Sequence, residues 1–222
     1  MRGSFALSAF TYPFPYMSIT IILIIIICGI SYYAFNNYSF MEKMIMNPYR
    51  VTKKNEYYRF ITSGFVHADY GHLIFNMLSL WFIGEGIERL FAMLFGASGT
   101  LYFLVLFILG IVISDVPTFF KNKSNSNYNS LGASGGVSAV LFAAILYAPL
   151  MDIYLYFFIQ LKAFIFGILF LGYSYYSDRK GGGYINHSAH LYGALFGMVF
   201  MAVVYPPSVP QFFQQILSWR LF

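Results

Sequence analysis

Charged residues are scarce in this chain. Only 9% of its 222 residues are Asp, Glu, Lys or Arg, whereas a soluble domain carries about 25%. None of these residue types occurs from Gly3 to Met41. This scarcity, together with 59% hydrophobic residues, excludes an ordinary soluble domain and indicates a polytopic membrane protein in contact with the lipid bilayer. The net charge of +5 is too small to indicate a nucleic-acid partner.

Cysteine and metal-binding motifs are also missing. Cys28 is the single cysteine, so no disulfide can form within the chain. The HExxH pattern of metalloproteases does not occur. His187 and His190 could bind a metal together, but no Asp, Glu or Cys stands beside them to complete a site. We therefore expect neither a metal nor another cofactor.

Long apolar runs dominate what is present. Six of them are close to the roughly 20 residues that a membrane-spanning helix needs. Their approximate bounds are 18–35, 71–91, 100–116, 132–148, 161–176 and 189–205. The sequence therefore predicts an all-α polytopic membrane protein, with a bundle of six transmembrane helices in residues 18–205.

Polar and aromatic segments separate these runs. Residues 36–70 predict a long ordered loop lying partly in the membrane interface, because Tyr and Phe suit the headgroup level. Residues 117–130 and 177–188 predict shorter polar loops. Outside the bundle we expect an N-terminal segment, 1–17, without the marks of a cleaved signal, and a C-terminal tail, 206–222.

The tail and the basic residues bear on how the chain lies in the membrane. Residues 211–222 are amphipathic, which suits either a helix on the membrane surface or an unstructured tail. Six spans put both termini on one side, together with 4 of the 13 Lys and Arg residues, and the positive-inside rule then places the termini outside. Five of the other nine lie in 36–70. A folded loop follows the rule poorly, so the count alone does not fix the orientation.

Polar side chains inside membrane spans are costly and therefore indicate function. His72 and Asn76, which follow His67, stand four residues apart and share a face of the second predicted helix. An imidazole and a carboxamide both donate hydrogen bonds, so the pair could bind a developing oxyanion. The same side chains could instead serve only to cross-link helices.

The stretch LGASGGVS places Ser134 in the first turn of the fourth predicted helix. Backbone N–H groups there lack intrahelical partners and the helix dipole is positive, so an oxyanion formed at Ser134 would find donors. Gly132 and Gly135 let the backbone turn sharply and approach a substrate. Alternatively, Gly135 and Ala139 belong to a stripe of small residues that serves helix packing.

His190 shares a face of the sixth predicted helix with Gly193 and Gly197. The GxxxG spacing allows another helix to approach closely. If that helix is the fourth, its small residues bring His190 within hydrogen-bond reach of Ser134. A nucleophile that is activated by a base needs this geometry.

The three groups occur in a fixed order: His-x-x-x-Asn, then Gly-x-Ser-Gly, then Ala-His-x-x-Gly-x-x-x-Gly. In this order they resemble the rhomboid family of intramembrane serine proteases, and the resemblance covers about residues 15–205. It implies a rhomboid-like bundle in which Ser134 is the nucleophile and His190 the general base. It also implies an oxyanion hole made of His72, Asn76 and the backbone N–H of Ser134.

Further positions follow or depart from the family pattern. By resemblance, Arg59 braces the first loop, and Gly193 and Gly197 pack the sixth helix on the fourth. Tyr58 replaces a family Trp, and Ser138 stands where some members place an aromatic ring against the catalytic histidine. The ring of His190 then needs support from elsewhere. Because no carboxylate is evident near His190, we expect a Ser–His dyad.

The resemblance implies an endopeptidase whose substrates are transmembrane protein segments, cleaved near one membrane face. A catalytically inactive relative that binds membrane helices is the main alternative. A small transporter is the other, although it would be expected to carry charges within its spans, and the fourth and sixth contain none. The compact six-span form leads us to expect a bacterial inner membrane, with the membrane of an organelle as the alternative.

Overall fold

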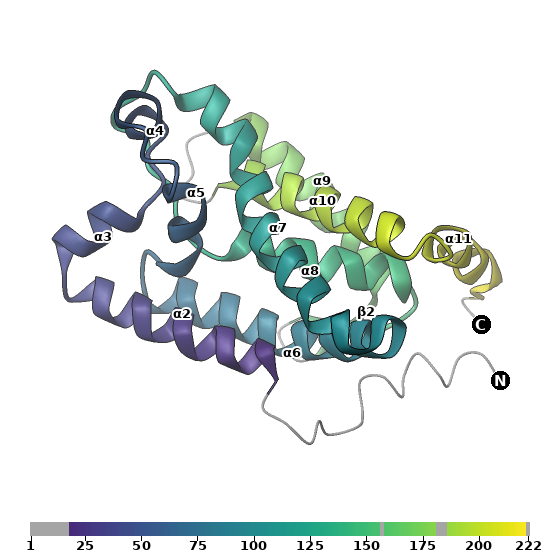
Figure 1. Ribbon diagram of the computed structural model, residues 1–222. Helices are drawn as coiled ribbons and strands as arrows, with labels where there is room; N and C mark the ends of the chain where they lie inside the picture. Colours follow the sequence, from purple (N-terminus) through teal and green to yellow (C-terminus); the bar gives the residue numbers. More distant parts are fainter. Residues whose placement is uncertain (1–17, 156–157, 181–185, 221–222) are drawn as a thin grey trace.

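The structure is a computed structural model that describes residues 18–155, 158–180 and 186–220 (Figure 1). Each of the six apolar segments contains a long helix. These helices are α2 (Ile19–Phe35), α6 (Tyr70–Phe95), α7 (Gly99–Asn122), α8 (Ser134–Tyr147), α9 (Ala163–Lys180) and α10 (His187–Val204). A short 3₁₀ turn, η2 (Gly96–Ser98), joins α6 to α7.

Side-chain caps fix where three of these helices begin. Ser18, Asp69 and Asn186 precede α2, α6 and α10, and each side-chain oxygen accepts a hydrogen bond from the N–H three residues on. Such caps satisfy N–H groups that have no partner within the helix. The caps of α6 and α10 stand directly before the histidine-bearing turns.

Helix α8 is the centre of the bundle. Every residue from Gly135 to Leu146 is buried, and the helix contacts α6, α7 and α10. Glycine makes the contact with α7 possible: a Cβ on Gly136 would lie 2.7 Å from the carbonyl oxygen of Phe107. Because α8 is enclosed along its length, the residues at its first turn have little freedom to move.

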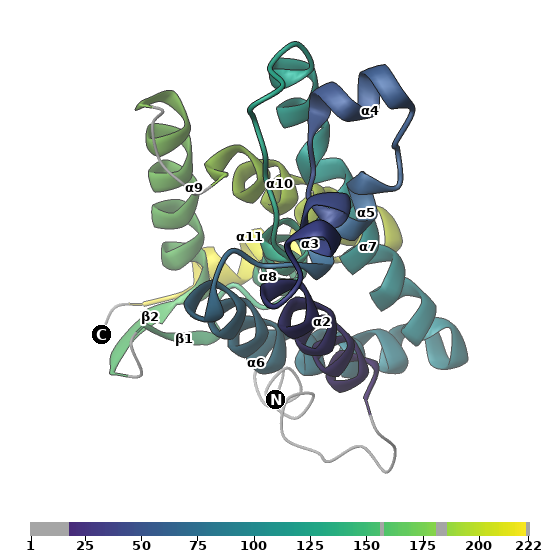
Figure 2. The same ribbon diagram turned by 90° about the vertical axis from the view of Figure 1, so that its left-hand side faces the viewer.

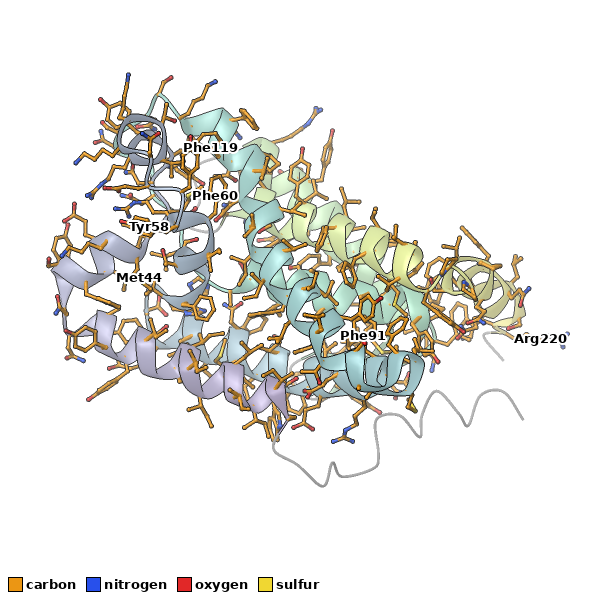
Figure 3. The ribbon with its side chains drawn as sticks, in the orientation of Figure 1. Met44, Tyr58, Phe60, Phe91, Phe119 and Arg220 are labelled. Atoms are coloured by element: carbon orange, nitrogen blue, oxygen red, sulfur yellow. The ribbon has the colours of Figure 1, made fainter. Side chains whose placement is uncertain are left out.

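The long first loop is ordered, as predicted. It contains α3 (Tyr38–Met44), α4 (Pro48–Lys54), α5 (Arg59–Thr62) and a 3₁₀ turn, η1 (Ser63–Phe65). Phe60 of α5 packs on Phe119 of α7, with ring centroids 5.5 Å apart (Figure 3). This contact holds the loop on the end of the third long helix.

Three helices run further than predicted, and one of them, α6, ends at Phe95 and not near residue 91. Helix α7 continues through Pro117 to Asn122, so the following loop begins near residue 123 and not at 117. Proline removes one N–H and leaves the carbonyl of Ile113 without its helical donor, a loss that packed membrane helices tolerate. Helix α9 likewise continues to Lys180, and its Ser, Asp, Arg and Lys residues form its last turn instead of a loop.

The expectation of an all-α fold is wrong in one place. Between α8 and α9 the chain forms an antiparallel hairpin of β1 (Asp152–Leu155) and β2 (Ile159–Lys162), which Figure 2 shows beside α9. Asp152 pairs with Lys162 across the strands, and their side chains form a 2.6 Å ion pair. Opposite charges at a cross-strand pair stabilise such a register.

The tail forms a helix, α11 (Ser208–Ser218). Nε2 of Gln215 donates to the carbonyl oxygen of Tyr147 at 3.1 Å, so α11 packs against the end of α8. The rings of Phe164 and Trp219 also meet edge to face, with centroids 5.2 Å apart. Of the two expectations for the tail, the helical one is confirmed and the unstructured one is wrong.

Two stretches are long and apolar enough to cross a membrane among the residues that the structure describes. The first is the stretch 70–122, which consists of α6, η2 and α7. The second is α10. Helices α2 and α8 are apolar but shorter, at 17 and 14 residues. By helix length and composition, the described residues therefore show fewer spanning helices than the six that the sequence predicts. The predicted segment 1–17 lies outside the described residues.

Candidate active site

Ser134 is the first residue of α8, at the end of a tight turn. Gly132 has a φ of +115°, a conformation that other residues rarely adopt, and a Cβ there would lie 2.6 Å from Cε1 of His72. The turn therefore lays the chain before Ser134 directly against the His72 ring. Both Ser134 and His72 are half-buried, so their polar atoms are not sealed from a substrate.

His190 is brought to the same end of the bundle by glycine contacts. A Cβ on Gly193 would overlap the carbonyl oxygen of Gly135, and one on Gly197 would overlap that of Ala139. Both pairs advance by four residues, so α8 and α10 run parallel with their backbones in contact. His190 stands three residues before Gly193 and Ser134 one residue before Gly135, so the two lie at neighbouring helix starts.

The two side chains are not hydrogen-bonded to each other in the described structure. The ring of His190 instead stacks on Phe170 of α9, with centroids 5.9 Å apart and planes at 26°. It also meets His187 edge to face at 5.8 Å. Phe170 thus supplies the ring support that Ser138 does not. Sequence reasoning missed Phe170, because only the folded chain brings α9 beside α10.

His72 and Asn76 lie on one face of α6, as their spacing predicts. Asn76 is buried, and its Nδ2 donates to the carbonyl oxygen of His72 at 2.9 Å. An amide nitrogen carries two hydrogens, so one remains for a further acceptor. The backbone N–H of His72 donates to Asp69 at 2.8 Å, which anchors this turn of the helix.

His67 holds the residue before Ser134. Its Nε2 lies 3.3 Å from the backbone N–H of Ala133 and accepts from it, while its Nδ1 lies 3.0 Å from Oγ of Ser31. Oγ of Ser31 donates to the carbonyl oxygen of Phe65, so Nδ1 is the atom that carries the proton. Burial, and to a lesser extent His72, lower the pKa of His67 to about 3, which keeps the ring neutral.

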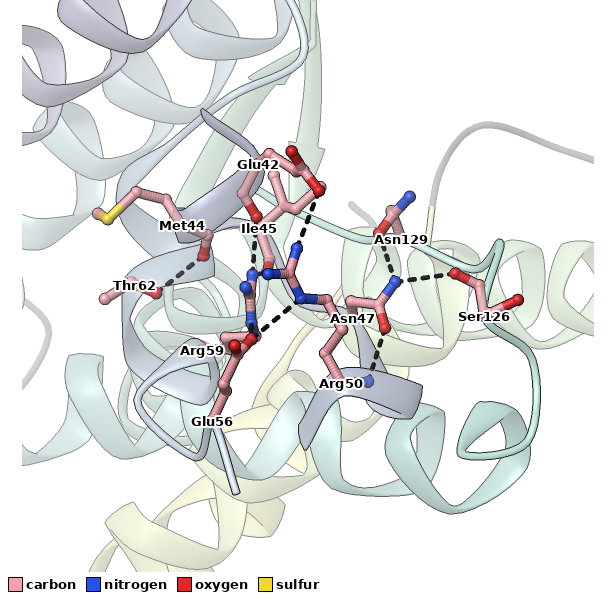
Figure 4. A network of polar contacts seen from close by, with 10 residues as sticks. All are labelled: Glu42, Met44, Ile45, Asn47, Arg50, Glu56, Arg59, Thr62, Ser126 and Asn129. Carbon is pink, nitrogen blue, oxygen red and sulfur yellow. Dashed lines mark hydrogen bonds and ion pairs between the residues drawn. The ribbon is translucent and has the colours of Figure 1, made fainter. Parts of the chain in front are cut away.

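Arg59 ties the first loop together (Figure 4). The side chain is fully buried and donates to the carbonyl oxygens of Glu42 and Ile45, at 2.9 and 2.6 Å. It also pairs with Glu56 at 2.6 Å. Burial raises the pKa of Glu56, but the hydrogen bond and charge of Arg59 outweigh this, and the pKa lies below its ordinary value. Tyr58 retains an aromatic contact with the guanidinium, at 5.4 Å.

The first loop is also fastened to the loop that leads to Ser134. Met46 and Ser130 form a two-stranded bridge with backbone hydrogen bonds of 2.9 and 3.0 Å. Nδ2 of Asn47 donates to Ser126 and Asn129, both at 3.0 Å (Figure 4). Residues far apart in the sequence thus position the turn that precedes Ser134.

A carboxylate to which sequence reasoning assigned no role lines a cavity beside Ser134. Asp115 of α7 lines a small cavity of about 10 Å³ together with Ser134 and Asn186. This volume is close to that needed for one water molecule. Asp115 makes no hydrogen bond to His190 in the described structure. Among the described residues, no three His, Cys, Asp or Glu side chains are arranged to hold a metal ion.

Comparison with known proteins gives consistent matches. A model of the Rhomboid domain matches residues 54–207. RHOMBOID-like protein 12, mitochondrial, of Arabidopsis thaliana is 32% identical over 167 residues, covering 70% of this chain and 50% of that protein. Rhomboid protease GluP of Bacillus subtilis is 26% identical over 166 residues, covering 74% and 29%. Presenilin-associated rhomboid-like protein A, mitochondrial, of Danio rerio is 31% identical over 151 residues, covering 62% and 35%.

The chain spans half or less of the length of these relatives. Two of the three carry mitochondrial names, so they do not favour a bacterial inner membrane over a mitochondrial one. The domain match covers more than half of the chain and includes every candidate site residue from Arg59 to Gly197. The chain therefore belongs to the rhomboid family, whose members are embedded in membranes.

Proposed function

We propose that this protein is an intramembrane serine endopeptidase that cleaves transmembrane protein segments with Ser134 and His190. The observation that carries the proposal is the parallel contact of α8 and α10. Because Gly193 and Gly197 meet the backbone of Gly135 and Ala139, the proposed nucleophile and the proposed base start neighbouring helices at one end of the bundle. The comparison with a relative named as a rhomboid protease supports the same reading.

The proposed reaction begins with Oγ of Ser134 attacking the carbonyl carbon of the scissile peptide bond. His190 takes the hydroxyl proton and later gives it to the departing amine, leaving an acyl-enzyme. Water, deprotonated by His190, then attacks the ester carbonyl and restores the Ser134 hydroxyl. The Phe170 ring holds the imidazole for both proton transfers.

The oxyanion of each tetrahedral intermediate would be held by three groups. They are the backbone N–H of Ser134, the free amide hydrogen of Asn76 and the imidazole of His72. The N–H of Ser134 is at a helix start, where it has no intrahelical acceptor. Loss of one such donor costs about 10²–10³-fold in kcat.

We propose that α2, α6, α7, α8, α9 and α10 all cross the membrane. The loops at residues 36–69 and 123–133 are joined by the Met46–Ser130 bridge and therefore lie at one face. Ser134 and His190 begin helices at that face, where water for hydrolysis is available. The relatives' names leave a bacterial and a mitochondrial membrane as candidates, which imaging of a tagged full-length chain would distinguish.

One observation favours the alternative of an inactive relative. Ser134 and His190 are not hydrogen-bonded in the described structure, and a base must reach its nucleophile to activate it. Catalytic hydrogen bonds are often long in substrate-free enzymes and tighten on binding, so the geometry is compatible with activity. The two readings differ in whether Ser134 reacts with an electrophile.

The test is covalent labelling by a fluorophosphonate probe in detergent-solubilised membranes. Oγ of Ser134 would displace fluoride from phosphorus and form a stable ester, with the proton passing to His190. We expect labelling in the wild type, none in Ser134→Ala or His190→Ala, and slower labelling in Asn76→Ala. Equal labelling of the wild type and Ser134→Ala would refute the proposal, and no labelling of either would favour the inactive relative.

A further inference from the structure

Asp115 is a buried carboxylate whose hydrogen-bond partners lie in two other segments of the chain. It lies in α7 with 7% of its surface exposed, and it forms no ion pair among the described residues. One oxygen lies 3.3 Å from Oγ of Ser63, in the first loop. The other lies 3.5 Å from Nδ2 of Asn186, before α10. Both oxygens of a carboxylate accept hydrogen bonds, so Asp115 can bind donors from two directions at once.

The first partner leads to the nucleophile. While its hydroxyl donates to Asp115, the carbonyl oxygen of Ser63 accepts from the N–H of Gly132 at 2.9 Å. Gly132 is the residue whose unusual backbone turns the chain into α8, two residues before Ser134. Asp115 therefore helps to fix the position of this turn through Ser63, which contacts both Asp115 and Gly132.

The second partner leads to the base. Oδ1 of Asn186 accepts from the N–H of Ala189 at 3.1 Å and caps the helix that carries His190. Nδ2 of Asn186 points toward Asp115 and also donates to Oγ1 of Thr118 at 3.2 Å. Two side chains of α7 thus hold the cap of α10 in one orientation.

We propose that Asp115 is a positioning residue that sets the starts of α8 and α10 relative to each other, and so aligns Ser134 with His190. The role rests on the proposed protease function and deepens it. Asp115 is not the third member of a triad, because it makes no bond to His190. It acts through Ser63 on the nucleophile's turn and through Asn186 on the base's helix.

The first test replaces the carboxylate. Asp115→Ala removes both acceptors, and we expect kcat for a transmembrane-segment substrate to fall by about 10–100-fold, since a misplacement of about 1 Å can cost 10²-fold. The rate constant of fluorophosphonate labelling should fall in parallel, while KM stays near the wild-type value. Asp115→Asn keeps the shape and an acceptor, and should retain most of the activity.

A swap of the two polar groups tests the contact itself. Asn186→Asp keeps a good helix cap but places two carboxylates against each other, and should slow labelling. Adding Asp115→Asn restores a donor and an acceptor in exchanged positions: the amide at 115 donates to the carboxylate at 186 and still accepts from Ser63. We therefore expect the double variant to label faster than Asn186→Asp alone.

Glu88→Gln is the matched control. Glu88 is also buried, at 5% exposed, and accepts from backbone and hydroxyl of Thr20. It lies twelve residues beyond Asn76 in α6, about 18 Å along the helix. Its loss should lower thermal stability without changing the labelling rate constant of the folded enzyme.

The outcomes separate this role from the proposed function. Labelling of the wild type at a rate that Asp115→Ala leaves unchanged would overturn the positioning role alone. So would an Asn186→Asp defect that Asp115→Asn does not relieve. A wild type without any Ser134-dependent labelling would overturn the protease proposal and this role with it.

Discussion

At the scale of single residues, the imidazole of His190 depends on packing. Among the described residues no carboxylate is hydrogen-bonded to it, and its ring contacts Phe170 and His187. A base must hold its ring within a narrow range of angles to take a proton and return it. Under the proposed mechanism, aromatic stacking from α9 supplies the orientation that a carboxylate supplies in proteases with a Ser-His-Asp triad.

Phe170→Leu should lower kcat more strongly than it lowers the stability of the fold. The loss of an aromatic pair removes about 0.5–1.5 kcal/mol, which corresponds to up to about tenfold in kcat if the ring contact is needed in the transition state. The measurement is kcat in reconstituted vesicles. Phe166→Leu is the control, because Phe166 packs on Phe170, with centroids 5.8 Å apart, and not on His190. An equal loss in both variants would contradict the assignment.

His67 makes stability depend on pH. Its pKa is about 3 in the folded chain, against about 6.5 when unfolded, so the unfolded state binds more protons between these values. The contribution of the neutral His67 ring to stability is therefore fully present above about pH 6.5 and is lost as the pH falls toward 3. The measurement is the drop in the thermal midpoint between pH 7 and pH 5 in detergent. This drop should be smaller for His67→Gln than for Ser134→Ala, which keeps all histidines. The same fall in both would refute this account.

At the scale of elements, the contact between α8 and α10 decides the geometry of the site. Its glycines leave no side chain between the two backbones, so the distance between the helices cannot adjust by a change of rotamer. Gly193 and Gly135 meet one turn or less from His190 and Ser134. A change in this contact is therefore transmitted directly to the side chains of Ser134 and His190.

Gly193→Ala should separate the two helices. Its methyl group would overlap the carbonyl oxygen of Gly135, and overpacking of this kind costs about 1–3 kcal/mol of stability. We expect a lower thermal midpoint and loss of probe labelling. Gly172→Ala in α9 is the control, because nothing lies within 4 Å of a Cβ there, and it should gain up to about 1 kcal/mol from helix propensity. Wild-type labelling of Gly193→Ala would contradict this role.

Helix positions could largely be predicted from sequence, but several ends could not. Long apolar runs identify a helix whatever its neighbours are. The polar end of α7 looked like a loop because Pro117 and the Asn residues are loop formers, yet packing on Phe60 and the bonds of Asn186 keep it helical. The β1–β2 hairpin was missed because only four residues form each strand, too few for a clear alternation.

At the scale of the whole molecule, some residues of the candidate site could be predicted from the sequence and others could not. Ser134, His190, His72 and Asn76 could be named because each sits in a local motif. Phe170, His67 and Asp115 could not be assigned a role, because their partners lie on other elements. Contacts such as Asp115 with Ser63, 52 residues apart, exist only once the chain has folded.

The hydrogen bonds between the first loop and the turn before Ser134 have a consequence for experiments outside a bilayer. The Met46–Ser130 bridge, the Asn47 bonds and the His67 contact are all internal hydrogen bonds, and none of them uses a lipid as partner. Because these bonds lie within the chain, we expect detergent extraction to preserve the turn that presents the Ser134 hydroxyl longer than it preserves the fit of α9 against its neighbours.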